Sequence, residues 1–187
     1  MAWFPAWNIT PIKHLAIRRP TTKMPTQREI LFARLDDLGI ASVTFEHEPV
    51  FTVEQSTSLR TTLPGAHTKS LFLVDKDGSC ALVVAKDETR VDLKKVAERL
   101  GIGRLSFGKA ALLAERLRVT PGSVTPFALI NDPATHVAVV IDAALLEFAE
   151  INCHPLENTA TTRLATADLL RFIKATGHEP VVVSFGP

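Results

Sequence analysis

Apolar residues recur at helical spacing directly after Thr26 and again in three later segments. In the stretch 26–40, TQREILFARLDDLGI, this spacing predicts an amphipathic helix that Thr26 caps and Gly39 ends. The same pattern predicts helices over 92–100, 110–118 and 166–176. Thr52 and Gln55 have capping-box spacing, which predicts a further short helix that ends before Pro64.

Runs of β-branched and aromatic residues alternate with these helices. Residues 42–48 alternate between polar and apolar positions and predict a strand. The segments KSLFLVD (69–75) and CALVVAK (80–86) flank an Asp-Gly pair and predict a β-hairpin. Further strands are predicted at PFALIN (126–131), HVAVVID (136–142), FAEINCH (148–154) and VVVSF (181–185). Strands grouped in the middle with short helices at the flanks indicate a single α+β domain with a mixed, largely antiparallel sheet.

The first 23 residues differ from the rest of the chain. Residues 1–28 contain five basic residues, no acid and both tryptophans, so we interpret 1–23 as a basic N-terminal extension, either a disordered tail or a mis-assigned start. Residues 24–187 then form the folded domain. Omitting 1–23 changes the formal charge from +1 to −3, because four lysines and arginines are lost.

Composition narrows the function classes. With 46% hydrophobic and 22% charged residues, the 187-residue chain is typical of a globular protein. The formal charge of +1 argues against a broad basic surface for DNA or RNA, although a narrow contact with RNA stays open. No apolar run is long enough to span a membrane. Cys80 and Cys153 form no CxxC pair, which favours core thiols in a reducing cytoplasm.

Several catalytic motifs are incomplete. GRLSFGK (103–109) has the spacing of a phosphate-binding P-loop, but Ala110 occupies the position of the magnesium-binding hydroxyl. The six histidines have neither HxH nor HxxxH spacing, so we expect no metal site and no cofactor. The chain also has no GxSxG element, which favours a reaction without a covalent intermediate.

Three local features are better candidates for a site. Lys69 begins a very apolar strand, where an ammonium group needs an anionic or polar partner unless its stem simply reaches to solvent. The loop 120–126 contains two prolines and a glycine, so it either aims free backbone amides at an oxygen or is only a rigid connection. His154 ends a strand before Pro155, and a lone histidine is often structural.

Four segments occur in an order that resembles a known family. They are GAHTKSLFLVD (65–75), RLSFG (104–108), VTPGSVTPFALIND (119–132) and CHPLENTATT (153–162). Over residues 27–185 the chain is similar to the YbaK and prolyl-tRNA-synthetase-associated editing domains, and within them to the freestanding alanyl-tRNA(Pro) deacylases.

This resemblance implies a cytoplasmic hydrolase that cleaves the ester of mischarged Ala-tRNA(Pro). Lys69 matches the functional lysine of the family, and His154 matches the histidine of its HPL element. The aminoacyl site would be formed by Gly122, Ser123, Val124, Thr125 and Pro126. The implied partners are the acceptor end of tRNA(Pro) and the prolyl-tRNA synthetase, with no cofactor. Close members of the family can have alanine in place of Pro126. Cys153 stands where a similar protein carries an aromatic residue, so the size and polarity of the aminoacyl site at this position stay open.

The chemistry of this reaction suits a site without a strong nucleophile. An aminoacyl ester is already activated, so a positioned water and oxyanion stabilisation suffice. The alternatives are a Cys- or Ser-specific deacylase and a non-catalytic module that binds tRNA or the synthetase. Candidate RNA contacts are Arg60, Arg90, Lys94, Lys95 and Arg104, although residues of this kind are more often ordinary solvated surface charges.

Overall fold

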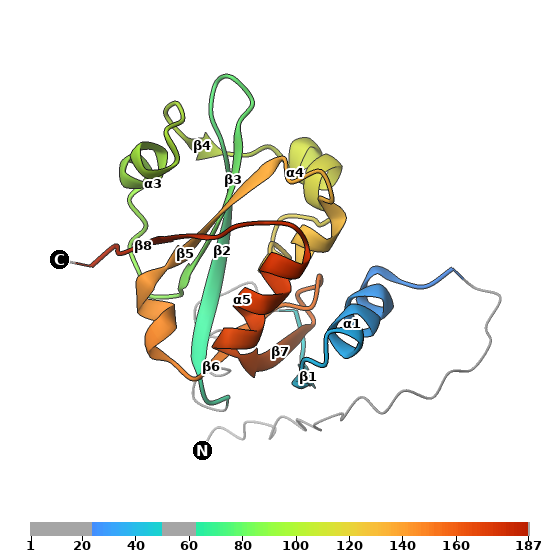
Figure 1. The fold of residues 1–187 in the computed structure, drawn as a ribbon. Coiled ribbons are helices and arrows are strands. Elements are labelled where there is room, and N and C mark those ends of the chain that lie inside the picture. The colour runs from blue at the N-terminus through green and yellow to red at the C-terminus, as the bar shows by residue number, and fades with distance from the viewer. Residues whose placement is uncertain (1–23, 50–62, 187) are drawn as a thin grey trace, which may run out of the picture.

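The computed structural model describes residues 24–49 and 63–186 of the chain, and a mixed sheet forms its centre (Figure 1). The strands found in these ranges are β1 (Ser42–Glu46), β2 (Ala66–Val74), β3 (Cys80–Lys86), β4 (Ser106–Phe107), β5 (Val137–Asp142), β6 (Glu150–Cys153), β7 (Ala160–Ala165) and β8 (Val181–Val183). Their order is β1-β7-β6-β2-β3-β5-β8, and β4 pairs with β2. Parallel pairs are β2/β6, β3/β5 and β5/β8, and the remaining pairs are antiparallel. The predicted single α+β domain with a mixed sheet is confirmed, and its antiparallel majority is small.

Short helices cover both faces of this sheet. They are α1 (Gln27–Asp37), α3 (Leu93–Leu100), α4 (Ala110–Leu117), α5 (Thr166–Ala175) and the 3-10 helices η1 (Pro126–Asn131) and η2 (Ala143–Glu147). The predicted cap of α1 is present, since the Thr26 hydroxyl accepts from the Glu29 amide while the Glu29 carboxylate accepts from the Thr26 amide. The four helices predicted in the described part of the chain are confirmed. The helix predicted from Thr52 and the extension 1–23 lie outside the described residues, so the domain boundary stays a prediction.

One prediction in the last third of the chain is wrong, and one strand was not predicted. PFALIN is not a strand but the 3-10 helix η1, with Pro126 in its first turn and the Thr125 hydroxyl as its cap. Phe127, Ala128 and Leu129 are fully buried, and a short apolar run buried on all sides has no period that separates strand from helix. The strand that was not predicted is β7, which follows the turn 154–159 and whose Thr162 hydroxyl hydrogen-bonds the Thr44 hydroxyl across the sheet at 2.9 Å.

Strand β2 joins the two halves of the sheet. One edge pairs with β3 from Thr68 to Val74. The other edge pairs with β6 only at Ala66 and His67, and with β4 only at Leu73 and Val74. Residues 68–72 therefore have no strand partner on that second edge within the described residues. The sheet has a notch there, between the end of β6 and β4.

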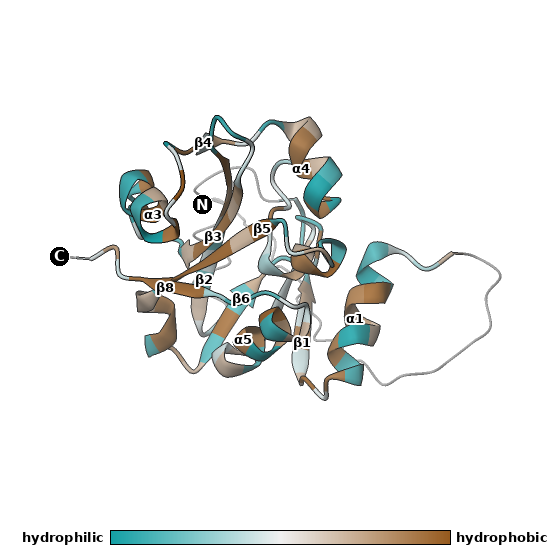
Figure 2. Cartoon of the chain, turned by 45° about the horizontal axis from the view of Figure 1, so that its top comes forward, coloured by the Kyte–Doolittle hydropathy of each residue, from teal (hydrophilic) through white to brown (hydrophobic). Residues whose placement is uncertain are grey.

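Hydrophobic residues pack on both sides of the sheet. Phe72 of β2 belongs to the larger core cluster, which also contains Phe127 of η1 and Phe172 of α5. Leu73, the next residue, belongs to a smaller cluster with Val96 of α3. Figure 2 shows the central strands as hydrophobic and the outer faces of the helices as hydrophilic. None of the described helices has the length and apolar content that a membrane crossing requires.

The buried carboxylate of Asp132 fixes the chain after η1. It accepts hydrogen bonds from the Val137 amide at 2.8 Å, the His136 amide at 3.1 Å and His178 Nε2 at 3.2 Å. Burial raises the pKa of Asp132, but these hydrogen bonds outweigh burial and hold the pKa below its ordinary value of 3.8. The ionised carboxylate therefore stabilises the fold.

We expect Asp132→Asn to lower the free energy of unfolding at pH 7 by about 2–4 kcal/mol, since a buried charged acceptor loses its donors. Because the pKa of Asp132 is lowered, this stabilisation is present above pH 3.8 and is lost as the pH falls below it. Urea unfolding of both proteins between pH 3 and pH 7 measures the difference. Asp77→Asn, at an exposed carboxylate that pairs with Lys76, is the control. Equal stability of wild type and Asp132→Asn at pH 7 would contradict the role of this carboxylate.

Candidate functional site

The register of β2 and β6 leads toward Lys69 and His154. The two strands run parallel, with Ala66 opposite Ile151 and His67 opposite Asn152. Lys69 lies two residues after His67, and His154 lies two residues after Asn152, just past the end of β6. The Thr68 hydroxyl donates to the Asn152 carbonyl at 2.7 Å and lies 3.5 Å from Cys153 Sγ, so the strands stay close at this point.

Lys69 lies at the notch in the sheet, and no described residue pairs with its ammonium group. It is half-buried, and its partner across the hairpin is the fully buried Ala85. Strand alternation puts its side chain on the same face as Leu71 and Leu73. Within the described residues this ammonium group makes no hydrogen bond and no ion pair. A partly desolvated cation favours an anionic or strongly polar ligand.

His154 offers a hydrogen-bond acceptor just past the end of β6. Its Nδ1 lies 3.1 Å from the Ala160 carbonyl, so Nδ1 carries the proton and Nε2 has the free lone pair. Burial lowers the pKa of His154 below 6.5, and His47, whose ring centroid is 6.4 Å away, lowers it further, while the Ala160 carbonyl opposes them. The imidazole is therefore neutral at pH 7.

The loop 122–126 presents backbone rather than side chains. Ser123, Thr125 and Pro126 are buried, Val124 is half-buried, and Gly122 is exposed at φ +90°, a conformation that favours glycine. The Ser123 amide donates to the Thr120 carbonyl at 3.0 Å. In the described part of the chain, the amides of Gly122, Val124 and Thr125 have no hydrogen-bond partner. The expected supply of free N–H groups is thus present in this loop.

This loop lies against the turn that His154 begins. A Cβ atom placed on Gly122 would come within 3.8 Å of Asn158 Nδ2. The turn 154–159 therefore adjoins both the loop 122–126 and the β2/β6 seam. No hydrogen bond or ion pair of the described residues joins Lys69 directly to the loop.

Two groups next to these residues had no signal in the sequence. Arg28 of α1 forms ion pairs with Glu46 of β1 and with Glu157, the neighbour of Asn158, and so ties the turn 154–159 to the first helix. Asn152 is buried; its Nδ2 donates to the carbonyls of Pro64 and Ala66, while its Oδ1 has no partner among the described residues. Arg28 and Glu157 are separated by 129 positions, so no local pattern could reveal their contact.

Two other features are not part of this arrangement. A surface cavity of about 460 Å³ lies between α1, β1, β7 and the start of α5, and none of the predicted site residues lines it. Burial raises the pKa of the Cys153 thiol to about 12, so this thiol is protonated at neutral pH and is no nucleophile. Within the described ranges, no three His, Cys, Asp or Glu side chains gather in a way that could hold a metal ion.

Comparison with known proteins gives the family of the chain. The sequence profile of the aminoacyl-tRNA editing domain matches residues 47–172. The chain is 40% identical over 153 residues to prolyl-tRNA synthetase associated domain-containing protein 1 of Danio rerio, covering 81% of this chain and 83% of that protein. It is 35% identical over 152 residues to the prolyl-tRNA editing protein ProX of Acetoanaerobium sticklandii, covering 81% and 93%.

The fold is also found among solved structures. A candidate trans-editing enzyme for prolyl tRNA synthetase superposes with a TM-score of 0.66 at 21% sequence identity, covering 88% of this chain and all of that one. At this identity the likeness shows the fold alone. Because the family profile and the relatives each span most of the chain, the protein belongs to the YbaK/ProX family of aminoacyl-tRNA editing domains, which are hydrolases acting on aminoacyl-tRNA.

Proposed function

We propose that this protein deacylates mischarged Ala-tRNA(Pro) in trans, releasing alanine and intact tRNA. The observation that carries the proposal is a half-buried ammonium, Lys69, that has no partner among the described residues and lies on the strand next to β6, which ends just before the neutral imidazole of His154. A relative of this chain is a prolyl-tRNA editing protein, which supports tRNA(Pro) as the substrate.

Hydrolysis of the ester needs little from the protein beyond placement and charge. A water oxygen attacks the ester carbonyl carbon, and the bond from that carbon to the 3′ oxygen of the terminal adenosine breaks. The 3′ oxygen takes up the proton that the attacking water loses. The carbonyl oxygen becomes an oxyanion on the way, and the free amides of the loop 122–126 are donors of the kind that stabilises it. This step requires no covalent intermediate.

Lys69 and His154 act on the terminal nucleotide in this mechanism. The Lys69 ammonium attracts the phosphate or hydroxyls of the terminal adenosine and holds the ester at the notch; a lysine is a poor base at pH 7. The lone pair of His154 Nε2 accepts a hydrogen bond from the 2′-hydroxyl, which in turn orients the attacking water. The two side chains thus supply complementary donor and acceptor groups.

Selectivity for alanine over proline is a matter of size. A synthetase pocket that holds proline cannot strongly reject the smaller alanine, since missing methylenes are worth only about 1–3 kcal/mol. A second, smaller site removes the error because proline does not fit. Val124 is the side chain of the loop 122–126 that is best placed to limit this site, because it is half-buried while the side chains of its neighbours Ser123 and Thr125 are buried.

The deciding experiment compares hydrolysis of Ala-, Cys-, Ser- and Pro-charged tRNA(Pro) by wild type and Lys69→Ala. We expect rapid loss of alanine alone and a rate at least about 100-fold lower in the variant, as for loss of one electrostatic donor in an active site. Lys69→Arg retains the charge and should lose less, and Lys76→Ala, at the exposed hairpin turn, should match wild type. Faster hydrolysis of the cysteine or serine ester would mean that the enzyme edits that amino acid instead of alanine. No hydrolysis of any charged tRNA would indicate a non-catalytic module that binds tRNA or the synthetase.

The pH dependence of deacylation reports on His154. Because the pKa of His154 is lowered, the neutral form persists down to pH 6.5, so the enzymatic rate should be level from pH 8 to 6.5 and fall only at lower pH. His154→Ala should lower the rate and remove this acid limb after subtraction of uncatalysed hydrolysis. His136→Ala, at an exposed histidine, is the control. An acid limb that survives in His154→Ala would assign it to another group.

Enlarging the pocket should relax the exclusion of proline. We expect Val124→Ala to begin hydrolysing correct Pro-tRNA(Pro) and to reduce the preference for alanine by about 10-fold or more. Thr125→Ala should instead lower the melting temperature, because Thr125 is buried and its hydroxyl accepts from the Phe127 amide. If Val124→Ala does not hydrolyse Pro-tRNA(Pro) while its hydrolysis of Ala-tRNA(Pro) stays normal, Val124 does not limit the size of the pocket.

A further inference from the structure

Basic residues concentrate in the segment from Arg90 to Arg118. This segment holds eight of the 17 lysines and arginines of residues 24–187 but only three of the 20 acids. The rest of that range holds nine basic residues against seventeen acids. The formal charge of the chain, close to zero, therefore hides a strong separation of charge along it.

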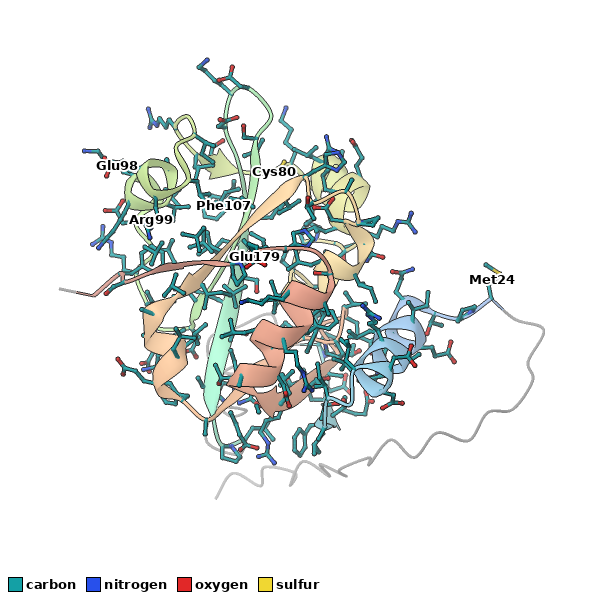
Figure 3. All side chains as sticks on the ribbon, viewed as in Figure 1. Met24, Cys80, Glu98, Arg99, Phe107 and Glu179 are labelled. Carbon is teal, nitrogen blue, oxygen red and sulfur yellow. The ribbon has the colours of Figure 1, made fainter. Side chains whose placement is uncertain are left out.

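The segment folds into one end of the molecule. Its elements α3, β4 and α4 lie in a row in both views, with β4 in the middle (Figures 1 and 2). Lys94 and Arg116 each lie 3.7 Å from a glutamate of their own helix. The other six basic side chains are exposed and make no ion pair within the described ranges: Arg90, Lys95, Arg99, Arg104, Lys109 and Arg118. Figure 3 shows Arg99 on the outer side of α3. These six residues are the basic face.

An exposed aromatic ring lies within the basic face. Phe107 is 66% exposed and stands between Arg104 and Lys109 in the sequence. Its backbone is fixed, because β4 pairs with β2 and the Gly108 amide donates to the Phe72 carbonyl at 2.9 Å. A Cβ atom on Gly108 would come within 2.4 Å of the Phe72 ring, so only glycine permits this close approach. The strand thus holds an apolar ring in water, and the cations next to it in the sequence, Arg104 and Lys109, have no ion pair among the described residues.

The strand register links Phe107 to the site. Phe107 is opposite Leu73, so its ring is on the same face of the sheet as Lys69, four residues back along β2. At about 3.3 Å per residue the two positions are roughly 13 Å apart. A few nucleotides of single-stranded RNA span this distance.

We propose that the basic face and Phe107 form the docking surface for the acceptor arm of the tRNA. The cations contact phosphates of the arm, and Phe107 stacks on an unpaired base near the 3′ end, which guides the aminoacyl ester toward Lys69. Positive charge interleaved with an exposed aromatic ring fits a nucleic acid, which has phosphates and flat bases, whereas an acidic protein surface accounts only for the charge. The identity of the RNA rests on the proposed function.

The role of the basic face is tested with two double variants, each of which reverses two positive charges. Lys95→Glu/Arg99→Glu changes α3, while Arg171→Glu/Lys174→Glu makes the same net charge change on α5. Binding of uncharged tRNA(Pro) is followed by fluorescence anisotropy from 50 to 200 mM salt. We expect the α3 variant to bind at least about 10-fold more weakly, with a salt slope smaller by about one for each lost phosphate contact. The α5 variant should bind like wild type.

The stacking part is tested with Phe107→Ala, against Leu146→Ala at another exposed apolar residue. Loss of one stacked base should weaken tRNA binding about 5- to 150-fold. Since stacking releases no counterions, the salt slope should stay that of wild type. Circular dichroism confirms that each variant is folded.

These experiments distinguish an error in the proposed docking surface from an error in the proposed function. Wild-type affinity in both the α3 and the Phe107 variants overturns the surface, even if the protein deacylates Ala-tRNA(Pro). Variants that keep tRNA but no longer bind purified prolyl-tRNA synthetase would make it a protein-docking face, which also overturns the proposal. Weakened tRNA binding in the variants supports the surface, even if wild type hydrolyses none of the charged tRNAs.

Discussion

The site depends on the way in which β2 shares its second edge between two short strands. β6 takes only the first two residues and β4 only the last two, so the stretch around Lys69 is left open between them. The His67 carbonyl accepts from Asp87 on the β3 side, and the Phe72 carbonyl accepts from Gly108 on the other. Alternation along the strand therefore turns the peptide groups of Ser70 toward the notch. A fully paired β2 would leave no room for a substrate here.

Buried carboxylates hold the loops around the sheet that frames this notch. Asp75 accepts from the amides of Asp77 and Ser79 at 2.9 Å and of Gly103 at 3.0 Å, so it joins the β2–β3 turn to the segment before β4. Burial raises the pKa of Asp75, but these amides outweigh it and lower the pKa overall. Asp132 does the same after η1. The rigidity of the site thus comes from backbone amides that converge on acids outside the site.

Local signals in the sequence predicted the elements that are locally determined. The Thr26 cap and the Asp-Gly turn act within a few residues, and the helix and hairpin that they predict both form. β7 was missed because its threonines are buried only through pairing with β1 and β6, far away in the chain. In the site, Lys69 and His154 are candidates from the sequence because each begins or ends a predicted strand, and the pairing of β2 with β6 ends two residues before each of them. The contact of Arg28 with Glu157 and the open Oδ1 of Asn152 are products of the tertiary fold alone.

The distribution of charge shows why net charge is a weak guide to partners. A formal charge of +1 argues against a basic surface only if the charges are mixed, and in this chain they are not. Electrostatic attraction of a polyanion acts over about one Debye length, near 8 Å in physiological salt, so a ligand at α3 and α4 is governed by the charges of that end of the molecule. The excess of acid elsewhere would repel RNA from the remaining surface and favour one orientation of approach. Segregation of this kind gives orientation without the strong, unselective binding that a uniformly basic protein has for nucleic acid.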